Sequence, residues 1–566
     1  MKILIVGGVA GGATAAARLR RINEQAEIIV FERGGYVSYA NCGLPYYIGG
    51  DITDKRALTL QSPRSFLRRF NVDVRVKQEV TAIDPEKKTV TVLNHETGET
   101  YSESYDKLLL SPGAKPTIPN LPGTEGERIF TLRTVEDTYR IKDYVSEAQV
   151  KSAVVVGGGF IGLEMAECLI NAGLSVTLLQ RSEHVMPNLD FDMASFVHGY
   201  MRYKGINLLR NQALKGYESK GGKVRVLRGN GDPIEADMVL LAIGVTPDTE
   251  LAKKTGLKLG LKDSILVNDK METSIPDIYA AGDAVEVINP ITGKPAVIPL
   301  AGPANKQGRI AADNINGGDS RYKGSIGAAV MKLFDMTVAT VGLTEKTAKL
   351  AGVDFDYCVT YSPNHATYYP GASNMTIKVL FEPKSGRLLG AQIVGFDGVD
   401  KRIDVLATAI RFKMTAYDLT ELELAYAPPY SSAKDPVNMV GYIMQNVLDG
   451  RVKQYYWNEA ETLPRDGSVQ IVDVRTPGEY DYGHIPGAVN IPVDEMRQHM
   501  GELDKTKPVY LNCQVGMRSY IAYCILTQSG YDCYNLAGGY HFYESAATEN
   551  SFREAPCHPC GVAIKE

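Results

Sequence analysis

Apolar positions gather twice along the chain into a short run that is followed by glycines and then by a helical pattern. The first case is KILIVGGVAGGATAAARLRR, leading to EIIVFER, and the second is SAVVVGGGFIGLEMAECLINAG, leading to SVTLLQR. A short apolar run bounded by glycines predicts a buried strand, and apolar positions three to four residues apart predict a helix. Each case therefore predicts the strand, turn and helix that begin a nucleotide-binding βαβ unit.

The remaining pattern divides the chain into further domains. A β-rich stretch separates the two units, and strands such as MTIKVLFE and LLGAQIVG begin a different pattern near residue 325. After a polar link, VQIVDVRTPGEYDYGHIPGAVNIP and KPVYLNCQVGMRSYIAYCILTQSG form a small α/β pattern. We expect the second unit to be inserted into the first, with domains at 1–115 plus 246–324, 116–245, 325–450 and 455–551, and a tail at 552–566. The predicted fold class is α/β, with two Rossmann-like three-layer dinucleotide-binding domains, an α+β domain and a small C-terminal α/β domain.

Composition narrows the function classes. The 566 residues are 44% hydrophobic and 22% charged, with a net charge of −5, so we expect several folded domains and no nucleic-acid partner. The chain shows neither a signal-peptide pattern at its start nor an apolar run near the roughly 18 residues that span a bilayer. We therefore expect a cytoplasmic protein without a membrane segment. The eight cysteines are too sparse for a disulfide scaffold.

The second glycine-rich turn has the complete pattern of a dinucleotide site. Gly157, Gly159 and Gly162 give G-x-G-x-x-G between an apolar strand and a helix that contains Glu164. Such a turn brings the helix N-terminus close to a pyrophosphate, although a plain strand-to-helix turn is the alternative. The first turn departs from the pattern because Val9 stands between Gly7 and Gly12.

The residues around these turns resemble one flavoprotein family. IVGGVAGG with Glu32, LLLSPGA, LLAIGV and TSIPDIYAAGD, which ends at Asp283, resemble the pyridine nucleotide-disulfide oxidoreductases over about Met1 to Gly450. The resemblance implies FAD in the first site, bonded through its ribityl chain by Asp283, and NAD(P)H in the second. The expected cofactor-binding residues are Gly7, Val9, Ala10, Gly12, Glu32, Arg33, Ser111, Gly113, Asp283, Ala301, Gly157, Gly159, Phe160, Ile161, Gly162, Glu164, Gln180, Arg181 and Gly244.

The end of SVTLLQR bears on the choice of nicotinamide. An acidic residue there would accept a hydrogen bond from the ribose 2′-hydroxyl and repel a 2′-phosphate, but the chain has Gln180 and Arg181. This pair favours NADPH, or the use of both nucleotides. A solvated loop cation is the alternative interpretation of Arg181, so NADH against NADPH stays open.

A single cysteine stands where disulfide reductases keep a pair. In SYANCGLPYYIGG, Cys42 has no second cysteine before Cys168, which we interpret as a core residue. Beside flavin and near a helix N-terminus, we expect the Cys42 thiol to have a lowered pKa. Without a resolving cysteine, its oxidised form is a mixed disulfide with a substrate thiol, a persulfide or a sulfenic acid.

The same stretch, with HATYYPG and LAYAPPYSSAKD, resembles the coenzyme A-disulfide reductases. That resemblance implies a homodimer, a mixed disulfide between Cys42 and coenzyme A, and active-site tyrosines at Tyr368 and Tyr426 from the dimerisation domain of the partner subunit. The histidine of peroxidase relatives is missing from the first helix, and Phe70 stands where the family has a substrate lysine. The residues expected to contact coenzyme A are Thr14, Arg18, Arg21, Ser38, Asn41, Asn305 and Lys434. By themselves, the two arginines also fit a solvated helix face.

The C-terminal α/β pattern resembles a rhodanese domain. It contains Asp473, Arg475, Glu479 and a CQVGMR loop from Cys513 to Arg518. Backbone N–H groups of such a loop stabilise a thiolate or persulfide, and Arg518 is expected to add charge. The Cys-x4-Arg spacing suits sulfur better than the phosphate of Cys-x5-Arg phosphatases. The tail pair Cys557 and Cys560 is a relay pair, half a metal site or incidental, and no metal site is predicted.

These observations predict an FAD-dependent NAD(P)H reductase of coenzyme A disulfide, coenzyme A persulfide or polysulfide. Cys42 is the expected nucleophile, and Cys513 is expected to supply or relay sulfane sulfur. Two alternatives are an NAD(P)H oxidase that uses oxygen and a non-enzymatic redox-sensing sulfur carrier. The physiological acceptor and the route of sulfur between Cys513 and Cys42 stay open.

Overall fold

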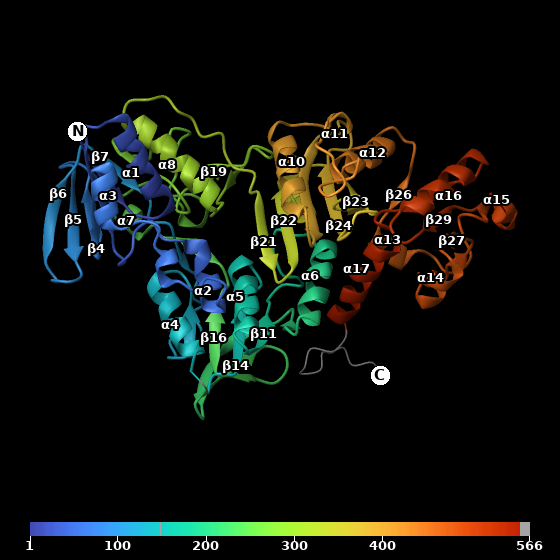
Figure 1. The fold of residues 1–566 in the computed structure, drawn as a ribbon, viewed down its shortest axis with the longest axis horizontal. Coiled ribbons are helices and arrows are strands. Elements are labelled where there is room, and N and C mark those ends of the chain that lie inside the picture. The colour runs from blue at the N-terminus through green and yellow to red at the C-terminus, as the bar shows by residue number, and fades with distance from the viewer. Residues whose placement is uncertain (148, 555–566) are drawn as a thin grey trace. The chain divides into compact units, whose positions relative to one another are not determined.

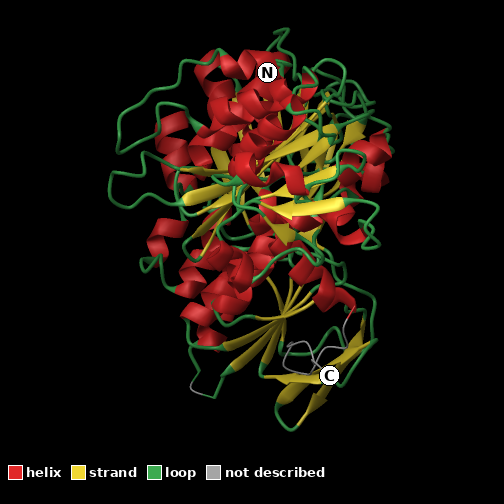
Figure 2. Cartoon of the chain, turned by 90° about the vertical axis from the view of Figure 1, so that its right-hand side faces the viewer, coloured by secondary structure: helices red, strands yellow, loops and turns green. Residues whose placement is uncertain are grey.

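The computed structural model describes residues 1–147 and 149–554, so the tail cysteines Cys557 and Cys560 lie outside the described residues. These residues form two compact units (Figure 1). One unit comprises Met1–Leu179 with Gln212–Gly327, and the other comprises Gln180–Asn211 with the chain from Ala328 onward. Helices cover the faces of the sheets in the side view (Figure 2). The second unit thus includes a segment that we expected in the second nucleotide domain, and the domain boundaries remain predictions.

The first unit begins with a five-stranded parallel sheet. Its strand order is β18 (Ile278–Ala280), β7 (Lys107–Leu110), β1 (Lys2–Val6), β2 (Glu27–Glu32) and β3 (Asp73–Val76). Helices α1 (Ala10–Ile22) and α8 (Ala301–Ile315) lie side by side over it (Figure 1). An antiparallel sheet follows, formed by β4 (Gln78–Asp84), β5 (Thr89–Asn94) and β6 (Thr100–Ser104). Its Val80, Val90 and Val92 side chains belong to a buried apolar cluster. This arrangement gives three layers around the first glycine turn.

A second parallel sheet in the same unit surrounds the second glycine turn. It contains β11 (Ser175–Leu179), β10 (Ser152–Val156), β16 (Met238–Leu241) and β9 (Ile129–Thr131), with helices α4 (Val135–Val145) and α5 (Phe160–Asn171). A three-stranded sheet of β13 (Leu214–Lys220), β14 (Lys223–Arg228) and β15 (Ile234–Ala236) follows. Two nucleotide-type sheets therefore lie in this unit, each with a glycine turn after its first long strand.

The second unit contains an antiparallel sheet followed by a parallel one. The antiparallel order is β21 (Ala329–Leu333), β22 (Met336–Gly342), β25 (Leu388–Gly395), β24 (Asn374–Phe381) and β23 (Asp356–Pro363), with helices α9 (Glu345–Ala351), α10 (Val399–Arg411), α11 (Ala416–Thr420) and α12 (Pro436–Leu448). The parallel order is β26 (Gln454–Tyr455), β30 (Cys533–Leu536), β29 (Val509–Asn512), β27 (Gln470–Asp473) and β28 (Val489–Asn490). Its helices are α13 (Trp457–Thr462), α14 (Pro477–Tyr482), α15 (Met496–His499), α16 (Met517–Gln528) and α17 (Gly539–Glu554).

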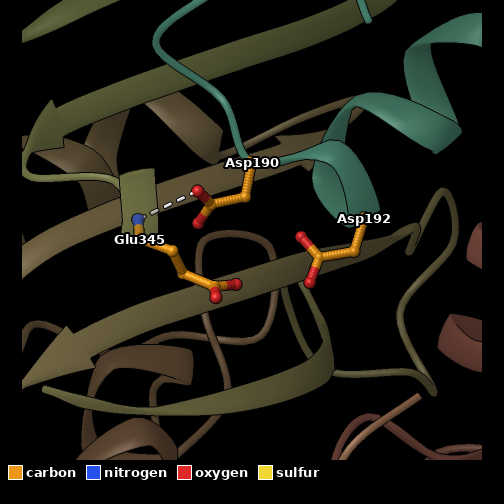
Figure 3. A group of neighbouring side chains, drawn as sticks. All are labelled: Asp190, Asp192 and Glu345. Atoms are coloured by element: carbon orange, nitrogen blue, oxygen red, sulfur yellow. Dashed lines mark hydrogen bonds between the residues drawn. The ribbon is translucent and has the colours of Figure 1, made fainter. Parts of the chain in front are cut away.

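One buried ammonium ties the segment after β11 to the antiparallel sheet. Lys378 of β24 is completely buried and lies 2.6–3.1 Å from carboxylate oxygens of Asp190, Asp192 and Glu345. Figure 3 shows the three carboxylates converging, with the Glu345 backbone N–H donating to Asp190. Oxygens this close could hold a cation, and the Lys378 ammonium supplies one. Helix α6 (Phe191–Tyr203) therefore begins at a fixed point beside the sheet.

Within the described residues, every helix is too short or too polar to cross a membrane.

Replacing Lys378 tests how much this cluster stabilises the second unit. Lys378→Met leaves buried carboxylates without their counterion, so we expect a loss of about 3–5 kcal/mol of stability. Denaturant unfolding followed by the fluorescence of Trp457, the chain's single tryptophan, measures it. Lys349→Met removes an exposed lysine 3.5 Å from Glu345 and should cost about 0.5 kcal/mol or less. Equal losses in the two variants would contradict the account.

Candidate functional site

The stretch around Cys42 is fixed to the first glycine turn by its backbone. Ser38 has a left-handed φ of 48°, and its N–H donates to the Gly8 carbonyl over 2.8 Å. Asn41–Gly43 then form a single 3₁₀ turn, and α2 (Leu44–Gly49) follows directly with Pro45 in its first turn. The exposed Cys42 thiol consequently precedes a helix N-terminus, as the sequence predicts.

Cys168 cannot act as the missing second cysteine in this arrangement. It is fully buried on α5, and a Cβ placed on Gly49 would come within 2.9 Å of its sulfur. Burial raises the pKa of the Cys168 thiol to about 12, which makes it unreactive near neutral pH. Its packing against α2 agrees with the prediction of a core residue.

The electrostatic surroundings of Cys42 differ from the expectation. Burial, then the carboxylates of Glu164 and Asp283, raise the pKa of the thiol, and only Arg133 opposes them. Burial also raises the pKa of Glu164 to about 7, although the Tyr46 hydroxyl donates to its carboxylate over 3.4 Å. The prediction of a lowered pKa is therefore wrong for the protein's own groups, because desolvation of the thiol, together with two acidic side chains, outweighs the short helix.

Arg133 belongs to this site although no sequence pattern singled it out. In the amide orientation that satisfies its hydrogen bonds, Asn41 donates to the Arg133 carbonyl (3.1 Å) and accepts from Nη1 (2.7 Å). The Tyr39 hydroxyl donates to the same carbonyl over 3.4 Å. Arg133 also holds down the pKa of Asp283, which burial raises. It is the cation that faces both the thiol and the expected flavin-binding carboxylate.

The first glycine turn is built for close backbone approach. A Cβ on Gly7, whose φ is +98°, would lie 2.1 Å from the Ser111 carbonyl oxygen, and one on Gly12 would lie 1.9 Å from the Gly7 oxygen. Glu32 ends β2 and accepts hydrogen bonds from the N–H groups of Gly8 and Gly34 at 2.9 and 2.8 Å. Val9 is the N-cap of α1, and Ala10 begins the helix. A free helix N-terminus beside a carboxylate fits a dinucleotide.

The second glycine turn combines close backbone packing at Gly157 with open space at Gly159 and Gly244. A Cβ on Gly157 would lie 2.3 Å from the Ala242 oxygen, whereas Gly159 and Gly244 have no neighbouring atom within 4 Å of theirs. Phe160 and Ile161 begin α5, whose first turn contains no acidic residue and whose N-cap, Gly159, makes no side-chain cap hydrogen bond. This free space at a helix N-terminus fits a pyrophosphate.

Gln180 and Arg181 differ in what they can offer a nucleotide. The Gln180 amide, buried in the second unit, donates to the Ser182 hydroxyl at 2.5 Å and to the His184 carbonyl at 2.9 Å. It therefore closes the loop instead of pointing outward. Arg181 is exposed and is the side chain of this pair that faces solvent.

Some expected substrate residues lie together on α1 and α8. The Thr14 hydroxyl donates to Asn305 over 2.9 Å, and Arg18 forms a 2.6 Å ion pair with Asp313. Arg21 is exposed one turn later. The structure thus commits Arg18 to a carboxylate, which weakens it as a phosphate-binding cation, whereas Arg21 is accessible.

The expected dimer-side residues belong to the second unit. Tyr368 and Tyr426 are 74% and 47% exposed, and their hydroxyls are 2.9 Å apart. Lys434 is exposed. The structure brings the two tyrosines together as one exposed polar pair.

The C-terminal sheet ends in a buried sulfur held by hydrogen-bond donors. The Cys513 sulfur accepts from the Gly516 N–H at 3.1 Å and from the Ser519 hydroxyl at 3.3 Å. Arg518 instead donates to both oxygens of Glu479 at 2.7 and 2.8 Å, and lowers the pKa of Glu479 to about 2. The expected extra charge from Arg518 is therefore already neutralised.

The loop after Cys513 is closed from the other side by the start of α17. The Tyr540 and His541 N–H groups donate to the Cys513 and Gln514 carbonyls at 2.7 and 3.0 Å. A Cβ on Gly539, whose φ is +68°, would lie 2.6 Å from the Cys513 oxygen and 2.7 Å from the Val515 nitrogen. Only a glycine permits this approach.

Comparison with known proteins assigns three segments of the chain to known families. Residues 1–308 match the family described as pyridine nucleotide-disulphide oxidoreductase, residues 328–436 its dimerisation domain, and residues 457–546 the rhodanese-like domain. The first match spans more than half of the chain. This chain is a pyridine nucleotide-disulfide oxidoreductase. Membership of this family confirms the predicted fold class and identifies the protein as a flavoprotein oxidoreductase. It also implies FAD and NAD(P)H as cofactors.

Three relatives of this oxidoreductase cover most of its length. The coenzyme A disulfide reductase of Staphylococcus epidermidis is 40% identical over 445 residues, 78% of this chain and 100% of that protein. The crystal structure of reduced Bacillus anthracis CoADR-RHD is 49% identical with a TM-score of 0.94, and covers 97% of this chain and 98% of its own. An NAD-dependent persulfide reductase from A. fulgidus is 38% identical with a TM-score of 0.90, and covers 96% and 100%.

Removing one carboxylate tests the origin of the raised Cys42 pKa. Glu164 is ionised above pH about 7, so its charge opposes thiolate formation at the pH where the thiol titrates. Glu164→Gln should shift the pH midpoint of Cys42 alkylation by iodoacetamide to a lower value, read by peptide mass spectrometry. Glu127→Gln changes an exposed carboxylate and should leave the midpoint in place. An unchanged or higher midpoint in Glu164→Gln would rule out this cause.

A methyl group on Gly539 tests the geometry of the Cys513 loop. Gly539→Ala forces the loop or the start of α17 to move, so we expect sulfur transfer from Cys513 to cyanide to fall about tenfold or more. Gly501→Ala adds the same methyl where no atom lies within 4 Å and should change the rate little. Equal rates in the two variants would show that the close approach is irrelevant to sulfur transfer.

Proposed function

We propose that the oxidoreductase uses NAD(P)H to reduce coenzyme A disulfide and coenzyme A persulfide through a mixed disulfide between Cys42 and coenzyme A. The observation that carries the proposal is an exposed Cys42 thiol whose nearest candidate partner in the sequence, Cys168, is buried and packed against Gly49. A thiol without a resolving cysteine needs a substrate thiol for that role. Relatives named coenzyme A disulfide reductase and persulfide reductase support this substrate class.

Either substrate leads to the same mixed disulfide between Cys42 and coenzyme A. With coenzyme A disulfide, the Cys42 thiolate attacks one sulfur, forms the mixed disulfide and releases one coenzyme A thiolate. With coenzyme A persulfide, the thiolate attacks the inner sulfur, which belongs to coenzyme A itself. The S–S bond of the persulfide breaks, and the outer sulfur leaves as hydrosulfide. Two electrons from NAD(P)H then return Cys42 to the thiolate and release coenzyme A. FAD, when bound, supplies the path for these electrons.

The residues of the chain have separate parts in this proposal. Arg133 orients Asn41 and favours the Cys42 thiolate, and Arg21 offers an accessible cation for coenzyme A phosphates. Arg181 favours NADPH, or the use of both nucleotides, by pairing with a 2′-phosphate. We further propose a homodimer in which Tyr368 and Tyr426 of one subunit complete the cysteine site of the other.

The presence of a rhodanese domain favours reduction of coenzyme A persulfide over reduction of coenzyme A disulfide alone. Donors from Gly516 and Ser519 surround the Cys513 sulfur, as a persulfide carrier requires. A reductase limited to coenzyme A disulfide would have no use for such a site. Cys513 would therefore supply sulfane sulfur to coenzyme A, and Cys42 would release it as sulfide.

Anaerobic kinetics of three cysteine variants test the proposal. Cys42→Ser should lose roughly 10³-fold or more in NAD(P)H-dependent reduction of coenzyme A disulfide and in sulfide release, because it removes the nucleophile. Cys513→Ser should retain disulfide reduction and lose sulfur transfer from a sulfane donor. Cys524→Ser, at a half-buried cysteine outside both sites, is the control and should behave as wild type.

Full sulfide release by Cys42→Ser would refute the mechanism. Oxygen consumption much faster than anaerobic turnover would favour an oxidase instead. Flavin content is measured for each variant so that lost cofactor is not mistaken for lost chemistry.

A further inference from the structure

Helix α17 touches two different functional segments of the second unit. At its start, Tyr540 and His541 bond the carbonyls of the Cys513 loop. Toward its other end it lies beside α6, as Figure 1 shows in dark red and teal, and the Ser545 and Ser195 hydroxyls are 2.6 Å apart. One rigid helix of the rhodanese domain therefore reaches the segment that follows β11.

Glu549 is the centre of this second contact. It is 3% exposed, and its carboxylate lies 3.2 Å from His198 Nδ1 and 3.1 Å from Arg210, and also pairs with Arg202. His198 Nε2 accepts the Val185 N–H at 3.2 Å, so the ring proton is on Nδ1 and is donated to Glu549. Burial lowers the pKa of His198 to about 4, which keeps the ring neutral at pH 7.

The groups that Glu549 orients hold the loop that contains Arg181. Arg210 donates to the Glu183 carbonyl at 2.8 Å and, through its other nitrogen, to the Glu549 carbonyl at 2.8 Å. His198 fixes the Val185 N–H, as described above. Backbone groups on both sides of His184 are thus bonded to residues whose own positions depend on Glu549.

We propose that Glu549 is a positioning residue for nucleotide recognition: through His198 and Arg210, the last helix of the rhodanese domain sets the conformation of residues 181–185. The inference rests on the proposed role of Arg181 toward a 2′-phosphate. Its consequence is that NADPH selectivity depends on a domain that takes no part in hydride transfer. The contact joins the sulfur-carrying domain and the nucleotide loop into one folded block.

The test compares two nucleotide fragments on the full-length, FAD-loaded enzyme. Calorimetry gives dissociation constants for 2′,5′-ADP, which has the 2′-phosphate, and for 5′-AMP, which lacks it. Glu549→Gln keeps the shape and removes the charge, so it should weaken 2′,5′-ADP roughly tenfold through loosened hydrogen bonds, and 5′-AMP less than about twofold. Hydrogen exchange of the Val185 amide should also become faster. Glu544→Gln, the same change elsewhere on α17, should alter none of these.

A second variant and a measurement of sulfur transfer show whether the Glu549 variants are correctly folded. Glu549→Asp retains the charge with a shorter reach and should give an intermediate effect. Sulfur transfer by Cys513 should stay near the wild-type rate in both Glu549 variants, because the change lies at the far end of α17. Equal weakening of the two fragments would indicate a general structural role and would overturn the proposal.

Arg181→Ala separates this inference from the function it rests on. If Arg181→Ala weakens 2′,5′-ADP but Glu549→Gln does not, the positioning role is wrong and the nucleotide assignment stands. If Arg181→Ala has no effect, both fail. Weaker binding in both variants, confined to the fragment that has the 2′-phosphate, supports the coupling.

Discussion

The buried ammonium of Lys378 holds together segments of the second unit that are far apart in sequence. Lys378 lies among the carboxylates of Asp190, Asp192 and Glu345, which come from the segment after β11 and from α9. A buried ammonium without these partners would be costly, and so would the carboxylates without it, so the four groups specify one arrangement of chain segments that are far apart in sequence. Because α6 begins at this cluster, its later residues His198 and Arg202 meet Glu549 of α17. The cluster therefore fixes the start of the helix whose later residues contact α17.

The two reactive sulfurs have opposite surroundings, which suits opposite tasks. The Cys42 residue is exposed, but desolvation of its thiol and then the nearby carboxylates raise the pKa, so the protein environment alone does not keep Cys42 as a thiolate. Cys513 is buried, and two hydrogen-bond donors are directed at its sulfur. In the proposed reaction Cys42 turns over with each substrate, whereas Cys513 holds sulfur between transfers. The substrate thiol takes the resolving role that a second cysteine has in a two-cysteine site.

Local sequence patterns predict features whose residues are close together in the chain. The glycine turns at Gly7 and Gly157 follow from spacing because strand, turn and helix succeed one another in the chain. Sequence patterns do not reveal residues whose partners are distant: Lys378 meets Asp192 across 186 positions, and Arg133, which lies between β9 and α4, meets Asn41. The pairing of Arg518 with Glu479 also reversed an expectation, because a loop motif shows which cation is near a sulfur but not which carboxylate neutralises it. The raised Cys42 pKa was missed for the same reason.

Coenzyme A is the proposed partner thiol of Cys42. The direct measurement is peptide mass spectrometry, under non-reducing conditions, of wild-type enzyme treated with coenzyme A disulfide in the absence of NAD(P)H. We expect a coenzyme A adduct on the peptide that contains Cys42, and its loss when NADPH or NADH is added anaerobically. An adduct confined to another cysteine, or Cys42 found only as a sulfenic acid, would contradict it.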